Sequence, residues 1–373
     1  MTDIKPSSQS ILLAAGGTGG HLFPAFALAQ ELGRRGITVD LMTDMRGDRY
    51  GGNFPARNVY QVPAATIASR NPFAVAKTGL TLSRGIAAAY KLLGEIKPAV
   101  VIGFGGYPTF PPMLAARARG IPTALHEQNA VLGRANTMLA KRVAAIATSF
   151  QNVKSLDGPL AAKVRFTGNP VRDIVIEAAK QPYAAPTATS PFSLVVFGGS
   201  QGARFFSDCV PPALASMATE LRQKLFVVQQ ARAEDVARVE AAYRAAGVRA
   251  NVSPFFANLP AEIAKSQLVI GRAGASTIAE LTVIGRPSIL VPLPHALDND
   301  QLLNATRLAD AGGAICIAQS ELTPARLAKD LATLMQSPSD LVGAAAAAKS
   351  QGRPDAVARL ASLVEELMQR RTA

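Results

Sequence analysis

Several residue types are scarce in this chain, and their scarcity excludes some classes of protein. The 373 residues include no tryptophan, 6% aromatic residues and two cysteines, Cys209 and Cys316. Two cysteines so far apart in the sequence give neither a disulfide framework nor the close ligand spacing of a zinc site, so we interpret them as small buried hydrophobic residues. The few aromatic residues and the scattered basic ones argue against stacking on bases, so we expect no nucleic-acid partner.

Long hydrophobic runs are also missing. Hydrophobic residues make up 49% of the chain, yet no stretch approaches the roughly 18–20 uninterrupted apolar residues that a membrane span requires. The apolar segment 11–15 is too short for the core of a signal peptide, and glycines follow it. The sequence therefore predicts a cytoplasmic protein with no transmembrane helix.

Acidic residues are few relative to basic ones. The chain has 26 Asp and Glu against 39 Lys and Arg, which gives a formal net charge of +13. This excess favours an anionic partner, such as a membrane surface, a phosphorylated substrate or a nucleic acid. A basic surface that binds no partner is the alternative, and the scarcity of aromatic residues makes nucleic acid the weakest of the three partners.

The chain is too long for a single ordinary core, so we expect two domains. Short apolar runs alternate with helical patterns along almost the whole sequence. This alternation predicts right-handed βαβ units and parallel sheets, in two Rossmann-like, doubly wound α/β domains. The expected strands are residues 10–14, 38–42, 99–102, 122–125, 144–147, 164–166, 193–197, 225–228, 251–254, 267–270, 288–291 and 314–317.

A linker is expected at residues 181–191, where Pro, Thr, Ser and Ala are frequent and no hydrophobic period is present. The two halves of the chain open in the same way, with a strand, a glycine-rich loop and a helix; Gly198 lies 182 positions after Gly16. We therefore predict a first domain over residues 1–180 and a second over 192–350. A final helix within 351–373 is expected to pack back onto the first domain.

The first glycine-rich loop, AAGGTGGHLFP, covers residues 14–24. It leads from a strand into a helix expected at 24–35, so its backbone N–H groups and the helix dipole are typical of a cradle for an anion or a sugar phosphate. The loop departs from the G-x-G-x-x-G spacing, and no Gly-Lys-Ser/Thr follows, so neither a dinucleotide site nor a P-loop is expected. A tight turn needed only for packing is the alternative.

Other expected strands also end in polar or glycine-rich segments. Residues 125–136, LHEQNAVLGRAN, place His126 and Glu127 at one strand end; neighbouring side chains of an extended chain point to opposite sides, so at least one of the two braces the loops. In the second half, FGGSQGARFF at 197–206 adds donors suited to a diphosphate. Glu280 is suited to bind two vicinal ribose hydroxyls, with a solvated helix glutamate as the alternative.

Seven blocks occur in a fixed order along nearly the whole chain. They are GGTGGH, GFGGY, HEQN, GNPVR, GGSQGA, R-x-G-A-x-T-x-x-E and DQLLNA. Each block alone is a weak signal, but together they resemble the MurG family of glycosyltransferases. The resemblance implies the GT-B architecture, in which two Rossmann-like domains face a deep cleft, with the acceptor mainly on the first domain and the nucleotide sugar mainly on the second.

The resemblance further implies a reaction. N-acetylglucosamine would be transferred, with inversion, from UDP-N-acetylglucosamine to the C4 hydroxyl of the N-acetylmuramoyl unit of undecaprenyl-pyrophosphoryl-N-acetylmuramoyl-pentapeptide. This acceptor is lipid I, and the product is lipid II for peptidoglycan biosynthesis. The alternatives are a glycosyltransferase of the same architecture with another acceptor and a nucleotide-binding module without activity. A dinucleotide dehydrogenase ranks last, because its one supporting signal is Asp40, at the end of the second expected strand, where such enzymes place a ribose-binding acid.

The matched motifs also imply substrate-binding residues. Thr18, Gly19 and Gly20 would lie at the donor's edge of the cleft, and Asn129 would hold the N-acetylglucosamine unit. Arg172 and Ser200 would lie near the nucleotide or diphosphate. Phe256 would lie beside the uracil, where family members usually carry an aliphatic residue, and Gln301 would bind the donor sugar. The strand-to-helix turn for the nucleotide would comprise Ala275, Ser276, Thr277, Ile278, Ala279 and Glu280, with Glu280 on the ribose hydroxyls.

The expected chemistry needs a base and a stabilised leaving group. We predict His21 as the base, because imidazole titrates near neutral pH and the loop aims it at the cleft. Glu127 is the alternative base, and a purely structural role is the alternative for His21. Backbone N–H groups and a helix N-terminus can stabilise the leaving UDP. Asp298 and Asp300 form an Asp-x-Asp pair, but they lie in the stretch that the resemblance assigns to donor binding. No other Asp-x-Asp motif of the metal-dependent sugar transferases is recognised, so no metal and no cofactor are expected.

Residues 67–93 mix apolar side chains with basic ones such as Arg70, Lys77 and Arg84. Such a segment suits an anionic bilayer surface, and a helix packed in the first domain with exposed basic residues is the alternative. Because the resemblance implies a lipid-linked acceptor, we predict a peripheral protein on the cytoplasmic face of the cell membrane, in contact with its anionic inner leaflet. Cell-wall synthesis proteins are expected as further partners.

Overall fold

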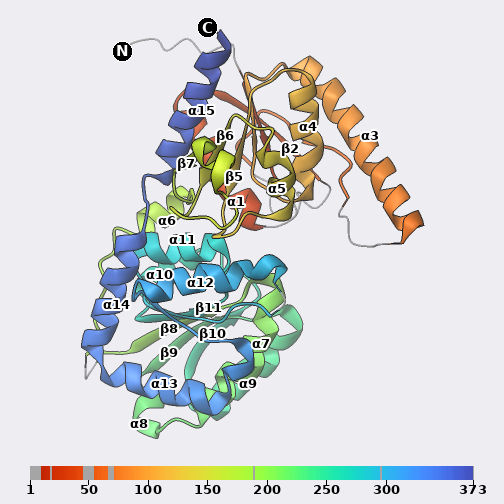
Figure 1. The fold of residues 1–373 in the computed structure, drawn as a ribbon. Helices are drawn as coiled ribbons and strands as arrows, with labels where there is room; N and C mark the ends of the chain where they lie inside the picture. Colours follow the sequence, from red (N-terminus) through yellow and green to blue (C-terminus); the bar gives the residue numbers. More distant parts are fainter. Residues whose placement is uncertain are drawn as a thin grey trace. The chain divides into compact units, whose positions relative to one another are not determined.

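The computed structural model describes residues 10–16, 19–44, 54–65, 71–187, 190–294 and 296–372. The chain forms two compact units: Met1–Arg172 together with Pro354–Ala373, and Asp173–Arg353. Each unit is built around one sheet of parallel strands that helices flank (Figure 1). None of the helices in the described ranges is long and apolar enough to cross a membrane.

The first unit contains a seven-stranded sheet in the order β3-β2-β1-β4-β5-β6-β7. Successive residues of β1, an interior strand, are buried on opposite faces: Ile11 and Leu13 pack with α1 and α15, and Leu12 packs with α3 and α4. Burial on both faces explains why the interior strands β1 and β4 are nearly continuous apolar runs. The strands are β1 Ser10–Ala14, β2 Thr38–Thr43, β3 Val59–Gln61, β4 Val100–Gly103, β5 Thr123–Glu127, β6 Ala145–Thr148 and β7 Val164–Phe166.

Helices from both ends of the chain cover this sheet. The last helix, α15, packs against α1, and Arg35, which follows α1, donates from Nη1 to Glu365 of α15 over 2.7 Å. The longest helix, α3, begins after Asn71, whose Oδ1 accepts a hydrogen bond from the backbone N–H of Phe73. The helices in the described part of this unit are α1 Gly19–Arg34, α3 Pro72–Ile96, α4 Phe110–Ala118, α5 Arg134–Ala140 and α15 Ala356–Thr372.

The second unit contains a six-stranded parallel sheet in the order β10-β9-β8-β11-β12-β13. The strands are β8 Phe192–Phe197, β9 Leu225–Gln230, β10 Arg249–Ser253, β11 Leu268–Gly271, β12 Ser288–Leu290 and β13 Ala314–Cys316. The helices are α6 Asp173–Ala178, α7 Gly199–Ala215, α8 Thr219–Arg222, α9 Val236–Ala245, α10 Leu259–Lys265, α11 Ala275–Ile284, α12 Asp300–Asp310, α13 Pro324–Gln336 and α14 Pro338–Gln351.

The prediction of two Rossmann-like units with parallel sheets is confirmed, and every expected strand overlaps a strand of the structure. Most strand bounds differ by one or two residues, and two differences are larger. The short edge strand β3 was not expected, and its residues are half-buried or exposed, so they lack the apolar signal of a core strand. Helix α1 begins at Gly19, five residues before Pro24, with Pro24 inside it.

The division between the units also differs from the expected one. The first unit ends after Arg172 and not at residue 180, because α6 packs against α10 and α11 of the second unit. Part of the expected linker is likewise bonded to the second unit: Arg286 donates to the carbonyl of Gln181 over 3.0 Å, and Tyr183 donates to the carbonyl of Gln267 over 3.0 Å.

Candidate functional site

The topology of each sheet brings two glycine-rich loops together. In the first unit β1 and β4 are neighbours, and strand order reverses between them, so the loops that follow them meet at the carboxyl edge. This is where open α/β sheets bind ligands. The two loops are tied to each other, since the N–H of Phe104 donates to the carbonyl of Ala14 over 2.9 Å. The second unit repeats the arrangement with β8 and β11.

His21 lies in the first turn of α1, at the edge of the first loop. Its Nδ1 donates to the carbonyl of Gly16 over 3.3 Å, so in the neutral ring the proton is on Nδ1 and Nε2 carries the lone pair. Burial lowers the pKa of His21 below its ordinary value. At neutral pH the imidazole is therefore uncharged, and Nε2 is able to accept a proton.

Two glycines of the GFGGY block leave room for this imidazole. Gly105 and Gly106 have φ of 85° and 73°, a region that side chains rarely adopt. A Cβ on Gly105 would lie 3.4 Å from Nε2 of His21, and one on Gly106 would lie 3.2 Å from Cε1. Thr109 fixes this turn by donating to the carbonyl of Gly105 over 2.5 Å. The block therefore shapes the wall against which His21 lies.

Glu127, at the end of β5, is almost fully buried. Its Oε1 accepts from the backbone N–H of Asn129 over 3.0 Å. Its Oε2 accepts from the N–H of Gly133 over 2.9 Å and from Nδ2 of Asn136 over 2.7 Å. Burial raises the pKa of Glu127, against the opposing effect of these bonds. Both carboxylate oxygens are thus used to hold the loop between β5 and α5.

His126, the neighbouring residue, is held on the other side of the strand. Its Nε2 donates to the carbonyl of Gly168 over 3.1 Å, and its Nδ1 accepts from Nε2 of Gln128 over 3.0 Å. The same Gln128 amide donates to the carbonyl of Phe104 over 2.9 Å. Burial lowers the pKa of His126 to about 4, and the two bonds fit the neutral ring. His126 and Glu127 therefore have separate partners and brace separate loops.

The remaining expected residues of the first unit are distributed over three loops. Gly19 and Gly20 open α1, and Asn129 lies in the loop that Glu127 holds. Arg172 stacks on Phe23 of α1, with Cζ 4.2 Å from the ring centre. Thr18 lies outside the described residues.

In the second unit the loop after β8 is compact and backed by an arginine. A Cβ on Gly198 would lie 2.4 Å from the backbone of Gly202, and one on Gly202 would lie 2.6 Å from Nε of Arg272. Arg272 is buried; it donates to the carbonyls of Val291 and Pro292 and to Oε1 of Gln319. Burial lowers its pKa to about 10, which still leaves a cation at neutral pH behind the loop.

The R-x-G-A-x-T-x-x-E block forms the loop after β11 and the start of α11. Gly274 caps this helix in an extended conformation, so the first N–H groups of α11 are at the carboxyl edge of the sheet. The first two turns of the helix contain five of the expected residues. Glu280, also expected at the site, follows them on the buried side of the helix. Those five residues are Ala275, Ser276, Thr277, Ile278 and Ala279.

Gln301, in the first turn of α12, connects two loops of this edge. Its Oε1 accepts from the backbone N–H of Ala273 over 3.3 Å and from that of Leu293 over 3.0 Å. Nearby in the chain, Asp298 and Asn299 have φ of 58° and 55°. Phe256 is half-buried in the loop after β10, and Ser200 lies in the first turn of α7.

Two other features of the described residues bear on function. The described residues contain no group of three or more His, Cys, Asp or Glu side chains able to hold a metal ion. Asp40 is fully buried and is bound by Arg57, with Nε 3.1 Å from Oδ1 and Nη2 2.5 Å from Oδ2. A ribose-binding role for Asp40 would require this pair to break, which disfavours the dehydrogenase alternative.

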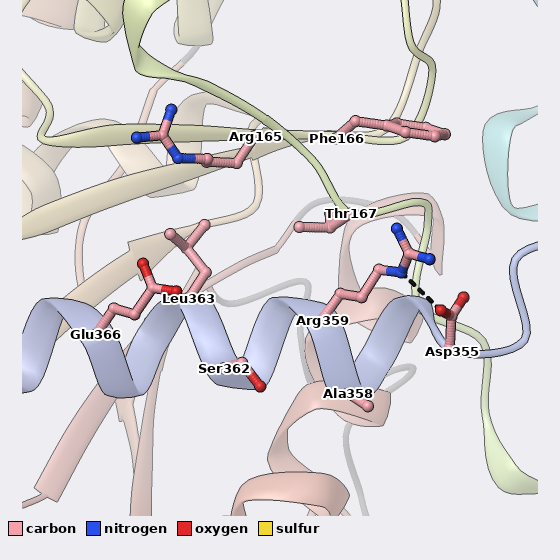
Figure 2. A pocket seen from close by; sticks show the side chains of 9 residues that line it. All are labelled: Arg165, Phe166, Thr167, Asp355, Ala358, Arg359, Ser362, Leu363 and Glu366. Carbon is pink, nitrogen blue, oxygen red and sulfur yellow. Dashed lines mark hydrogen bonds and ion pairs between the residues drawn. The ribbon is translucent and has the colours of Figure 1, made fainter.

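A groove of about 460 Å³ lies elsewhere in the first unit, between β7 and α15 (Figure 2). Its walls carry charges of both signs, and Arg359 is paired with Asp355 over 2.6 Å. None of the expected site residues lines it. The lining residues are Arg165, Phe166, Thr167, Asp355, Ala358, Arg359, Ser362, Leu363 and Glu366.

The paired glycine-rich loops at the switch points of two Rossmann-like units define a two-unit α/β protein of the nucleotide-binding type. Comparison with protein families makes this specific. The glycosyltransferase family 28 N-terminal domain matches residues 11–148, and the glycosyltransferase family 28 C-terminal domain matches residues 193–360. The chain belongs to glycosyltransferase family 28 and is a glycosyltransferase.

Individual relatives match over almost their whole length. The chain is 56% identical over 357 residues to a protein of Sinorhizobium fredii, a match that covers 96% of this chain and 95% of that protein. It is 54% identical over 362 residues to a protein of Mesorhizobium japonicum, a match that covers 97% of this chain and 96% of that protein. Both are UDP-N-acetylglucosamine–N-acetylmuramyl-(pentapeptide) pyrophosphoryl-undecaprenol N-acetylglucosamine transferases. The crystal structure of Acinetobacter baumannii MurG is similar, with a TM-score of 0.77 and 28% identity over 96% of this chain and 99% of that one.

Sequence reasoning gave no role to two residues that the structure makes conspicuous. Arg272 belongs to the R-x-G-A-x-T-x-x-E block, and its place directly after the buried strand β11 is a signal of a buried cation. Asn169, in GNPVR, carried no signal of its own, because its surroundings come from strands distant in the sequence.

Proposed function

We propose that this chain transfers N-acetylglucosamine from UDP-N-acetylglucosamine to undecaprenyl-pyrophosphoryl-N-acetylmuramoyl-pentapeptide, which makes lipid II for peptidoglycan. The observation that carries the proposal is the near full-length similarity at 54–56% identity to transferases of this name. The duplicated loop clusters support it, because two substrates require two sites. The second unit binds the nucleotide sugar, and the first binds the acceptor.

The donor site is assigned to the switch point of the second unit. The N-termini of α7 and α11 supply backbone N–H groups for the diphosphate, and the buried cation of Arg272 adds a favourable field. The family motifs assign Ser200 and Arg172 to the same nucleotide. Glu280 binds the ribose hydroxyls, Phe256 the uracil and Gln301 the sugar. Gln301 is suited to this role because its Oε1 already orders two loops, which fixes the direction of its amide.

The reaction is a single displacement that inverts the anomeric centre. The C4 oxygen of the acceptor forms a bond to C1 of N-acetylglucosamine as the bond from C1 to the β-phosphate oxygen breaks, and UDP leaves with the electron pair. The hydroxyl proton passes to Nε2 of His21, whose lone pair is fixed by the bond from Nδ1 to Gly16. Asn129, Gly19 and Gly20, together with Thr18, hold the reacting sugars.

Glu127 is a positioning residue in this mechanism and not the base. Both of its oxygens accept hydrogen bonds from the loop that carries Asn129. A proton taken up from a substrate would weaken those bonds and loosen the loop. His21 differs from Glu127, because its bond to the carbonyl of Gly16 is made by Nδ1 and not by Nε2, the atom that takes the proton.

The acceptor is bound to a membrane, and α3 is the proposed contact with the anionic inner leaflet. Phe73 is 88% exposed and Leu80 is 53% exposed, although both are apolar. Lys77, Arg84 and Lys91 of the same helix are exposed as well. Exposed apolar residues among cations suit a helix lying at an anionic interface. The protein thus works as a peripheral protein on the cytoplasmic face of the cell membrane, near proteins of cell-wall synthesis.

A transfer assay tests the function. Purified protein is given UDP-N-acetylglucosamine with lipid I, or with soluble sugars and aglycones in its place, and labelled product is counted. The proposal predicts lipid II with lipid I and little product with the other acceptors. Transfer to a soluble acceptor alone would instead favour a different glycosyltransferase, and donor binding without transfer to any acceptor would favour a binding module.

A further inference from the structure

The loop that follows β7 is fixed against two neighbouring strands. The backbone N–H groups of Thr167 and Gly168 both donate to the carbonyl of Thr148 at the end of β6, over 3.1 and 3.0 Å. The carbonyl of Gly168 accepts from Nε2 of His126 in β5 over 3.1 Å. Gly168 has a φ of 85°, so the chain turns there and Asn169 is held at the carboxyl edge of the sheet. Its position is thus well determined by strands that already carry the candidate site.

Asn169 has an unusual side chain. It is 6% exposed, yet among the described residues neither its Oδ1 nor its Nδ2 has a hydrogen-bond partner. The hydroxyl of Thr148, fully buried beside the carbonyl that holds Gly168, is also without a partner in that part of the chain. Leaving a buried polar group unsatisfied costs about 1–3 kcal/mol, and native proteins rarely do so without a reason.

Other buried amides of this unit do not share this property. Gln128 donates from Nε2 to the carbonyl of Phe104 over 2.9 Å, and Asn136 donates from Nδ2 to Glu127 over 2.7 Å. Each of them serves the folded chain through at least one atom. The side-chain amide of Asn169 makes no hydrogen bond to the described chain through either Oδ1 or Nδ2. A partner outside the described chain must therefore bind these two atoms.

We propose that Asn169 is a substrate-contact residue that binds two neighbouring hydroxyl groups of a pyranose. A primary amide presents a donor and an acceptor side by side, and each sugar hydroxyl can donate and accept. A trans acetamido group fits less well, because its N–H and C=O point in opposite directions. The hydroxyl pair belongs either to the donor sugar, at C3 and C4, or to the acceptor sugar, at C4 and C6. The inference rests on the proposed transfer reaction.

A contact of this kind has a signature that a structural residue lacks. Replacing an unsatisfied buried amide by an apolar group of similar size removes a desolvation cost from the unliganded protein. Asn169→Leu is therefore expected to keep or raise the melting temperature without substrates while weakening substrate binding. Thr282→Val is the matched control, since the buried Thr282 hydroxyl donates to the carbonyl of Ile278 over 2.8 Å; it is expected to lower the melting temperature and leave KM unchanged.

The experiment measures melting temperature, kcat and both KM values for the wild type, Asn169→Leu, Asn169→Ala and Thr282→Val. We expect a KM about tenfold higher for one sugar substrate in both Asn169 variants. UDP-N-acetylglucosamine analogues that lack the C3 or C4 hydroxyl, and a lipid I analogue that lacks the C6 hydroxyl, identify the source. The analogue that lacks the contacted hydroxyl should lose affinity for the wild type and lose none for the variants.

Two results would overturn the proposal. One is an unchanged KM for both substrates in Asn169→Ala, with a lower melting temperature, which would make Asn169 a structural residue satisfied by water. The other is a raised KM in the variants while each deoxy analogue loses the same affinity for the variants as for the wild type. Asn169 would then act through another group and not through a contact with the missing hydroxyl. If Asn169→Leu does not fold, Asn169→Ala decides alone. A wild type that fails to use lipid I refutes the proposed function instead, and is seen before any variant is compared.

Discussion

The imidazole of His21 lies against Gly106: a Cβ atom on Gly106 would be 3.2 Å from Cε1 of His21 and 3.3 Å from Nδ1. Gly106→Ala should therefore displace the ring and break its alignment with the reacting hydroxyl. We expect kcat to fall by roughly 10–100-fold, as misplacement of a catalytic group typically does. Steady-state kinetics with saturating donor and acceptor measure this fall.

Gly120→Ala provides a matched control for this variant. Gly120 has a φ of 65°, and no described atom lies within 4 Å of its Cβ position. Both substitutions put an alanine at a positive φ. The backbone cost is large at Gly106, where ψ is 161°, and only the substitution at Gly106 also meets His21. Equal losses of kcat in the two variants would show that strain, and not displacement of the imidazole, explains the effect.

Gln301→Glu separates the two proposed functions of this side chain. The carboxylate keeps an oxygen that accepts from the N–H groups of Ala273 and Leu293, but it loses the NH₂ group and adds negative charge near the diphosphate. We expect KM for the sugar nucleotide to rise by at least about tenfold, with little change in melting temperature. Gln223→Glu makes the same charge change at an exposed position and should leave KM unaltered; a similar rise there would mean that net charge alone is responsible.

His126 should make stability depend on pH. Its pKa is about 4 in the folded protein, compared with the ordinary 6.5, so between these values the unfolded chain binds more protons. The free energy of unfolding should therefore decrease as the pH falls, by about 2 kcal/mol from pH 7 to pH 5. Urea unfolding at the two pH values measures it. His126→Gln, which retains a donor for Gly168, should show a decrease smaller by about that amount, and an equal decrease would contradict the assignment.

Membrane binding should depend on the exposed apolar residues of α3. Phe73→Ser removes the most exposed large hydrophobic side chain of this helix, and we expect several-fold weaker binding to vesicles that contain anionic lipid. Phe255→Ser is the control, because Phe255 is 73% exposed but belongs to the second unit. Co-sedimentation with vesicles measures both, and equal losses would assign the contact to exposed aromatic residues in general.

The sheets and their loops were predictable because their signals are local. Continuous apolar runs such as Ser10–Ala14 mark strands buried on both faces, and the glycines that follow them mark the loops. The edge strand Val59–Gln61 was missed because its residues are largely exposed. The boundary after Arg172 was missed because it depends on how α6 packs, which composition does not record.

Much of the candidate site depends on pairings that no local pattern shows. The contact of Gly105 and Gly106 with His21 joins loops after two strands that are adjacent in the sheet and distant in sequence. The two oxygens of Glu127 are occupied by Asn129, Gly133 and Asn136, and spacing alone left open whether this residue or His21 is the base. The family motifs indicated that His21 and Glu127 belong to the site. The bonds of each residue in the folded chain support a base role for His21 and a positioning role for Glu127.

The pH dependence of kcat/KM for wild type and His21→Ala tests the central claim most directly. Because burial lowers the pKa of His21, the account predicts that kcat/KM rises with pH through a single ionisation below 6.5 and is level above it. His21→Ala should lose this ionisation and roughly 10²–10⁴-fold of kcat, with a smaller change in KM. An unchanged turnover, or the same acidic limb in His21→Ala, would contradict the assignment of His21 as the base.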